Sequence, residues 1–283
     1  MKNILMIIIS FFITLNAIEV TPKYVKNATT ALIILEGKDI SEPKLTFDKH
    51  NINFFPFPRE KNKYYALIPV SYYKDIKKYR IIISYIKDQK KIFKGLSINV
   101  IDGKYKSEVI NVSKNKVTLS EKNKKRVQKE YSEAMKIYNN ISPQLYLNGK
   151  FIYPINSKIT SDFGTKRIYN GSLKSYHSGT DFRARIGTKI KAVNNGIVVL
   201  SENRFYAGNS IIIDHGQGIY SCYYHLSKLN FKVGEKVKKG DIIALSGDTG
   251  RITGPHLHFA FRIHGIQVNP IQLMTLINNN NIY

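Results

Sequence analysis

Five of the seven histidines in this chain lie between positions 177 and 258, in short groups whose residue types could do chemistry. A neutral imidazole can bind zinc through one nitrogen or can accept a proton, and a carboxylate nearby can join a metal site. The spacing therefore predicts a metal centre or an acid–base site. The groups are His177-Ser-Gly-Thr-Asp181, Asp214-His215-Gly216, Tyr224-His225-Leu226 and His256-Leu257-His258.

The pair His256 and His258 has the spacing of two side chains on one face of a strand. Residues i and i+2 of a strand point the same way, so both imidazoles can face one site while Leu257 packs behind them. His177 and Asp181 are four residues apart, but Ser-Gly-Thr is a poor helical interior. A turn or an irregular strand is expected to bring these two side chains together.

A catalytic zinc site usually has three protein ligands and one open position. The residues suggest His177, Asp181 and one member of the pair His256 and His258 as ligands. The other member and His225 would then lie near the metal as acid and base, or as hydrogen-bond donors. No HExxH motif is present, so proton transfer would fall to histidine.

These motifs carry a family resemblance. The stretches His177–Asp181, Tyr224–Leu226 and Gly247–Phe259 resemble the LytM/lysostaphin family of zinc endopeptidases. The resemblance covers roughly residues 150–272, and all motif histidines of the family are present in order. The segments Asp162-Phe163-Gly164, Val193–Val198 and Val233–Asp241 also fit its pattern.

The resemblance implies a zinc cofactor and assigns its ligands. It makes His177, Asp181 and His258 the metal ligands, with His225 and His256 as the catalytic histidines. Family members also use a tyrosine near the first ligand; Tyr169 and Tyr176 are both candidates, and Tyr169 is the first choice. The substrate would be the stem peptides of peptidoglycan, with a D-alanyl cross-link preferred over a pentaglycine bridge. His215, His264 and His50 are expected to be structural.

The elements that must position these residues predict a mainly β fold. Residues 150–275 form the expected all-β peptidase domain, and residues 276–283 a C-terminal tail. Residues 18–105 consist of short β-type runs, which suit a small antiparallel sandwich such as an immunoglobulin-like domain. The strands expected in the peptidase domain are 189–193, 196–201, 210–214, 219–224, 242–246 and 256–262.

Residues 106–149 are expected to form a helical linker. Val127, Tyr131, Ala134, Met135 and Tyr138 recur at helical spacing, which predicts one amphipathic helix over 118–140. Thr118 with Glu121 has the pattern of a capping box. As a hypothesis, this helix and the N-terminal domain cover the zinc groove and restrain the enzyme.

The N-terminus predicts export. Residues 1–17 have a basic start, an apolar run and a small residue before polar sequence, as in a secretory signal peptide. No stable membrane span is expected after its cleavage, and the expected location is the periplasm or cell envelope. Cys222 is the only cysteine, so no internal disulfide and no thiolate zinc site can form. The oligomeric state is left open by the sequence.

Features of the sequence also fit three other functions. The net charge of +24 favours anionic partners, but it is spread along the chain and no nucleic-acid motif accompanies it, so no nucleic-acid partner is expected. Residues 237–247 also resemble the hairpins of biotinyl and lipoyl domains, which would leave the histidines unexplained. The main alternative is a non-catalytic LytM-like wall-binding regulator of other hydrolases, although such relatives typically lack ligand residues.

Overall fold

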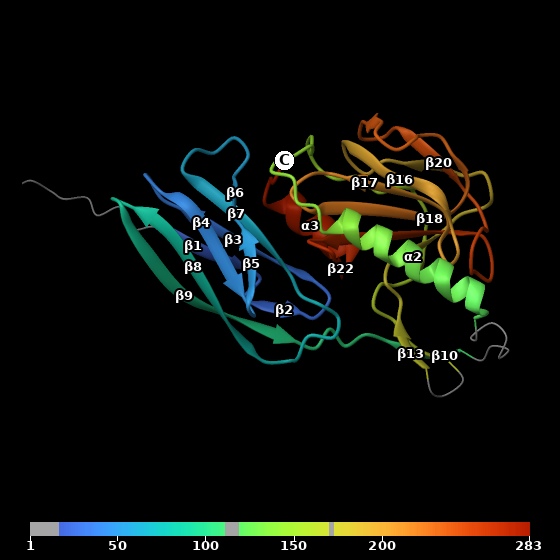
Figure 1. Cartoon of the computed structure of the whole chain (residues 1–283), viewed down its shortest axis with the longest axis horizontal. Coiled ribbons are helices and arrows are strands. Elements are labelled where there is room, and N and C mark those ends of the chain that lie inside the picture. The colour runs from blue at the N-terminus through green and yellow to red at the C-terminus, as the bar shows by residue number, and fades with distance from the viewer. Residues whose placement is uncertain (1–16, 111–118, 170–172) are drawn as a thin grey trace, which may run out of the picture.

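The computed structural model describes residues 17–110, 119–169 and 173–283, with the side chains of 110, 169, 173 and 174 also outside the description. Two β-rich parts lie side by side along the long axis of the molecule (Figure 1). The prediction of a mainly β fold is confirmed. The predicted signal peptide falls almost entirely on residues that are not described. No helix in the described ranges is long and apolar enough to cross a membrane.

The N-terminal part is a sandwich of two sheets around one apolar core. One sheet has the order β1 (Ala17–Thr21), β3 (Thr30–Glu36), β7 (Lys63–Pro69), β6 (Phe55–Pro56). The other has the order β2 (Tyr24–Lys26), β9 (Lys90–Ile101), β8 (Lys78–Lys87), β4 (Ser41–Phe47), β5 (His50–Asn53). Short β strands were predicted for residues 18–105, and β2 to β9 lie within that range.

Strand β3 is buried on both faces, which explains why its sequence is an unbroken apolar run rather than an alternating one. Ile33 and Leu35 belong to the sandwich core, whereas Leu32 and Ile34 belong to the core of the C-terminal part. The two parts therefore share packed side chains across β3. Residues 18–105 and 150–275 were expected as separate domains, and a continuous apolar core joins them.

The C-terminal part is built on a ten-stranded sheet. Its main path is β11 (Ile159–Ser161), β14 (Thr180–Arg183), β21 (His256–Ile263), β18 (Ile219–Leu229), β17 (Gly208–Asp214), β16 (Gly196–Arg204), β19 (Lys236–Val237). Off this path, β15 (Lys189–Lys191) pairs with β20 (Ile242–Ser246), β20 also pairs with β18, and β22 (Ile266–Val268) pairs with β21. All six strands predicted for this region are present.

A smaller sheet lies beside the large one. It consists of β10 (Ser107–Ile110), β12 (Lys166–Tyr169) and β13 (Leu173–Tyr176). Strand β10 comes from the segment between the two parts and pairs in parallel with β12, while β12 and β13 form an antiparallel hairpin. The segment expected as a helical linker therefore also supplies a strand next to the C-terminal part.

Helix α2 (Glu121–Tyr138) lies across the large sheet (Figure 1). Its start differs from the prediction: Ser120 is the N-cap and accepts from the backbone N–H of Asn123, while Thr118 lies outside the described residues. Ala134 and Tyr138 are buried against the sheet, but Tyr131, expected on the apolar face, is exposed. The neighbouring Glu130 accepts from the backbone N–H of Phe205, in the turn that follows β16.

Helix α3 (Pro270–Asn279) closes the C-terminal part. Leu276, Ile277 and Ile282 are buried in the same core as the large sheet. Residues 276–283 therefore do not form the expected tail, because their apolar side chains complete the core. Helix α3 also contacts the sandwich, since the side-chain amide of Gln272 exchanges two hydrogen bonds of 3.0 and 2.9 Å with the backbone of Thr30.

Candidate metal centre

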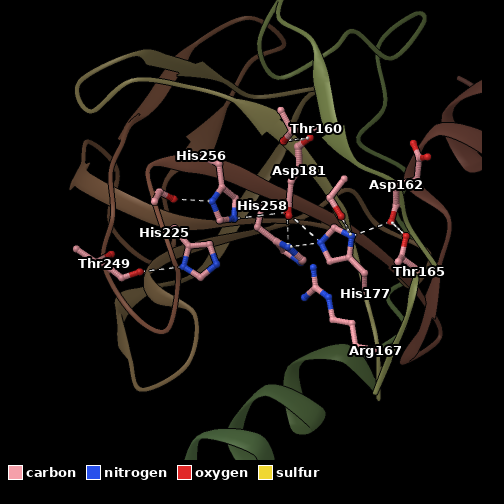
Figure 2. A network of polar contacts seen from close by, with 12 residues as sticks. Thr160, Asp162, Thr165, Arg167, His177, Asp181, His225, Thr249, His256 and His258 are labelled. Carbon is pink, nitrogen blue, oxygen red and sulfur yellow. Dashed lines mark hydrogen bonds and ion pairs between the residues drawn. The ribbon is translucent and has the colours of Figure 1, made fainter. Parts of the chain in front are cut away.

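Three side chains converge on one point of the large sheet. Asp181 on β14 and His258 on β21 are direct partners in an antiparallel ladder, and His177 lies just before β14. His177 Nε2 is 3.0 Å from Asp181 Oδ1 and 3.1 Å from His258 Nδ1, while His258 Nδ1 is 2.8 Å from Asp181 Oδ1 (Figure 2). We call His177, Asp181 and His258 the donor cluster. All three are buried.

The ring of His177 is held by the turn that follows β11. Its Nδ1 lies 2.8 Å from the carbonyl oxygen of Asp162 and 3.2 Å from Ser161 Oγ. A carbonyl oxygen can only accept, so Nδ1 carries the proton and Nε2 presents a lone pair to the donor cluster. The backbone of Gly164, at φ +86°, donates to the carbonyl of His177 and fixes this turn against β13.

The donor cluster has the composition and spacing of a metal site. The lone pair of His177 Nε2 faces Asp181 Oδ1 at 3.0 Å, so two acceptor atoms lie together with no proton between them, and a second imidazole nitrogen lies beside both. Two imidazoles and a carboxylate are ligands that zinc accepts, and atoms bound to one tetrahedral zinc at its usual bond lengths lie about 3.4 Å apart. The three atoms of the cluster are close to that spacing, and a shared cation would relieve their mutual repulsion.

The electrostatics of the cluster favour an ionised carboxylate. Burial alone would raise the pKa of Asp181, but the nearby rings of His177 and His258 outweigh it and hold that pKa well below its usual range. Burial lowers the pKa of His258, although Asp181 opposes this effect. An ionised carboxylate next to imidazole lone pairs is the state that binds a cation.

His225 and His256 lie beside the donor cluster. Their ring centroids are 5.0 Å apart, and His256 Nε2 is 3.6 Å from Asp181 Oδ1. His225 Nδ1 donates to the carbonyl of Thr249 and His256 Nδ1 to that of Gly254, each at 2.8 Å (Figure 2). Both Nε2 atoms are therefore left as lone pairs. Burial and the charge of His258 lower the pKa of His225 to about 3, so its ring is neutral at neutral pH.

The orientation of His225 depends on a break in strand β18. Tyr224 stacks on His258, at a centroid distance of 5.6 Å and an interplanar angle of 16°. Strict alternation would turn the next residue to the opposite face of the sheet. His225 instead has φ +61°, which few non-glycine residues adopt, and its ring lies against His256 and His258. This local conformation brings the fifth residue to the site.

The two candidate tyrosines lie at opposite ends of the β12–β13 hairpin. Tyr169 ends β12, and its side chain is outside the described part of the structure. The ring of Tyr176 is stacked 3.9 Å from Tyr72 with parallel planes, and its hydroxyl donates to Gln267 at 3.0 Å. Burial raises the pKa of Tyr176 to about 12. Tyr176 is thus engaged in packing with the N-terminal sandwich.

Tyr224 is a neighbour of the site that the sequence reasoning did not assign. Its ring covers His258, and its hydroxyl is 3.3 Å from the hydroxyl of Tyr138 on α2. The available signal was alternation on the strand, which places Tyr224 on the same face as Tyr220 and Cys222. Through this pair of hydroxyls α2 contacts the wall of the site.

His215 and Cys222 occupy packed environments, whereas His50 on β5 is exposed. His215 is fully buried, with Nδ1 2.7 Å from the carbonyl of Asn195 and Nε2 2.8 Å from Ser221 Oγ. Burial lowers its pKa to about 4. Cys222 is buried beneath α2, 3.4 Å from the hydroxyl of Tyr138, and burial raises the pKa of its thiol. Among the described residues of the N-terminal sandwich, none makes a polar or ring contact with the five site residues.

The C-terminal part is similar to proteins of known family. Residues 175–270 match the model of Peptidase family M23, a range that contains all five site residues. Peptidoglycan DD-endopeptidase ShyA of Vibrio cholerae serotype O1 is 38% identical over 159 residues, which are 50% of this chain and 37% of that protein. Peptidoglycan DD-endopeptidase ShyC of the same organism is 40% identical over 115 residues, 40% of this chain and 26% of that protein.

The chain thus spans well under two thirds of the length of these curated relatives. A crystal structure assigned to peptidase M23, from Pseudomonas aeruginosa, matches with a TM-score of 0.65 and 24% identity. The match covers 86% of this chain and 92% of that one, so the likeness in fold includes residues beyond the M23 range.

Proposed function

Because residues 175–270 form a domain of peptidase family M23, we propose that this protein is a zinc-dependent endopeptidase that cleaves peptide cross-links of peptidoglycan. The bond we favour is a D-alanyl cross-link, and the place of action is the cell envelope after export. Support for the bond comes from the names of the relatives ShyA and ShyC, both DD-endopeptidases.

The observation that carries the proposal is that two sets of imidazole rings lie together. One set belongs to the donor cluster, and the other consists of His225 and His256. Three donor atoms lie within 3.1 Å of one another, and two further imidazoles present unprotonated Nε2 atoms beside them. The first group can hold a metal through His177 Nε2, Asp181 Oδ1 and His258 Nδ1. His225 and His256 can transfer protons while all three residues of the donor cluster remain available as metal ligands.

When bound, zinc supplies a Lewis acid that polarises the scissile carbonyl and lowers the pKa of water to about 7. The chain's own residues then have separate tasks. One of the two, His225 Nε2 or His256 Nε2, would accept the proton of the attacking water, and that proton would pass to the leaving amine, with the other ring as a hydrogen-bonding partner. The carbonyls of Thr249 and Gly254 hold both rings in the tautomer that this task needs.

Digestion of purified sacculi tests the proposal. We expect residues 18–283 to consume cross-linked muropeptide dimers, and the variant His258→Ala to leave them intact because it lacks a ligand. His50→Ala is the matched control, since it removes an exposed histidine of the sandwich and should digest like the parent. Zinc content, measured by mass spectrometry of the metal, should be stoichiometric in the parent and in His50→Ala.

The products identify the bond, because each cleavage site leaves a different pair of muropeptide ends. Intact dimers in the presence of zinc-loaded, folded parent protein would contradict the enzymatic proposal. That result would support the wall-binding regulator instead.

A further inference from the structure

One face of the β12–β13 hairpin is turned toward the donor cluster. The ladder pairs Lys166 with Tyr176 and Arg167 with Ser175, and it continues to His177, whose N–H donates to the carbonyl of Thr165. Residues two apart on a strand share a face, so Thr165 and Arg167 lie on the same side of the hairpin as His177. Lys166 lies on the opposite side, with Tyr176.

Arg167 presents its charge to the metal centre. Figure 2 shows its guanidinium pointing toward His177 and His258. Its Nε donates to Glu108 Oε1 at 2.8 Å, and within the described residues neither terminal nitrogen has a hydrogen-bond partner. The side chain is 26% exposed, so it is partly desolvated but still open to a ligand. A guanidinium held at Nε keeps its two terminal nitrogens free for an anion.

Glu108 has the right position to orient this guanidinium. It lies on β10, directly opposite Arg167 in the parallel ladder between β10 and β12. The carboxylate is 43% exposed, so the ion pair adds little stability by itself. Its effect is to fix the direction of the guanidinium. The segment that connects the two parts of the molecule thereby reaches the rim of the metal centre.

From this arrangement we infer that Arg167 binds a substrate carboxylate next to the scissile bond, and that Glu108 is its positioning residue. The inference rests on the proposed function and specifies its substrate: a cross-link whose leaving amine is attached to a carbon that also bears a free carboxylate. Two terminal N–H groups of arginine match the two oxygens of a carboxylate. A pentaglycine bridge offers no such group beside its amide.

A structural reading of the same contact is that Glu108 and Arg167 merely tie β10 to β12. The two readings differ in one measurable respect. A structural pair would affect cleavage of every substrate equally, whereas a recognition pair affects only substrates that carry the carboxylate. The test therefore compares two substrates on each variant.

The probes are a cross-linked muropeptide dimer with this carboxylate free and the same dimer with the carboxylate amidated. With the parent protein we expect kcat/KM for the free form to exceed that for the amidated form by about 10- to 100-fold, mainly through KM. Arg167→Gln should lose that preference while keeping its zinc content. Glu108→Gln should lose part of it, and Lys166→Gln, a loss of the same charge from the opposite face, should keep it.

The outcomes separate the inference from the proposed function. If the parent cleaves both dimers and Arg167→Gln retains the parent's preference, Arg167 does not recognise the carboxylate and the inference is overturned. An equal rate for both dimers with the parent overturns it as well. If zinc-loaded parent cleaves neither dimer, the proposed function itself fails and the inference falls with it.

Discussion

Two buried histidine networks occupy opposite faces of the same sheet. The donor cluster lies on the face that carries His256, His258 and Tyr224. The second network, His215 with Ser221 and Tyr223, lies on the core face, where the ring of His215 packs edge-on to Phe151 at 5.5 Å. Ser221 Oγ is 2.8 Å from His215 Nε2 and 3.1 Å from the hydroxyl of Tyr223.

The difference between the networks is the supply of protons. Around His215, hydroxyl groups can donate or accept as required, so a neutral ring is fully satisfied without an ion. Around His177 Nε2 the partners are a carboxylate oxygen and an imidazole nitrogen, and the opposite ring nitrogen has already used its proton. Both networks are buried, and each has at least one histidine. The feature that indicates a metal is a carboxylate oxygen facing His177 Nε2, with no hydroxyl group among the described partners of that nitrogen.

The largest expected effect is loss of a carboxylate from the donor cluster. Asp181→Asn keeps the volume of the side chain, but a neutral amide binds a cation much more weakly than a carboxylate does. We expect zinc affinity to fall by more than the roughly 100-fold that loss of an outer-shell partner can cost. Competition with a fluorescent zinc chelator measures this. Unchanged affinity would mean that the metal is held elsewhere.

The next effect separates proton transfer from metal binding. His225→Ala and His256→Ala should each lower kcat by about 10²- to 10⁴-fold, the usual contribution of a general acid or base. Both variants should bind zinc like the parent because neither ring belongs to the donor cluster. Single-turnover cleavage of a muropeptide dimer, with zinc content measured on the same samples, gives both quantities. Loss of zinc from either variant would show that the substituted histidine is a zinc ligand.

The sequence predicted the strands well because their patterns are local. The alternation in β21 was enough to place His256 and His258 together, and the large sheet then brought Asp181 opposite His258. The position of His225 could not be derived in this way. Its positive φ depends on a change of partner strand, since β18 pairs with β21 up to Tyr224 and with β20 from Leu226.

Packing between distant segments was the second limit of prediction. The parallel stacking of Tyr176 on Tyr72 involves the N-terminal sandwich, and nothing near Tyr176 in the sequence indicates it. The exposure of Tyr131 has a similar cause, because Glu130 and Arg204 determine which side of α2 meets the sheet; the carbonyl of Glu130 accepts from Arg204 at 2.6 Å. The core that the two parts share across β3 also depends on packing between distant segments, so the sequence did not predict it.

The buried network predicts a pH effect on stability. Burial lowers the pKa of His215 to about 4, whereas the unfolded chain has the ordinary value near 6.5. Between these two pH values the unfolded state takes up a proton that the folded state does not. Stability is therefore complete above pH 6.5 and declines as the pH falls toward 4, by about 3 kcal/mol from this ring.

Nitrogen chemical shifts of the imidazole ring test this directly. The ring of His215 should remain neutral at pH 5 while the protein is folded. A ring that titrates near pH 6.5 in the folded protein would show that solvent reaches the network, and the proposed contrast with the donor cluster would lose its basis.

The smallest effects come from two serines that each contact one histidine ring. Ser221→Ala removes a buried hydroxyl from His215 Nε2 and should lower the free energy of unfolding by about 1–3 kcal/mol, with zinc affinity unchanged. Ser161→Ala removes a contact of 3.2 Å from His177 Nδ1, but the carbonyl of Asp162 remains at 2.8 Å on the same nitrogen. Zinc affinity should therefore fall by at most about tenfold, the low end for an outer-shell partner, with little change in stability.

Thermal unfolding and chelator competition on both variants complete a two-by-two comparison. The expected result is that each serine affects only the property of its own network: stability for Ser221 and metal affinity for Ser161. If Ser221→Ala weakened zinc binding as much as Ser161→Ala, the two faces of the sheet would be coupled. The strand β18, which carries Ser221 on one face and Tyr224 on the other, would then be the route, because Tyr224 stacks on His258.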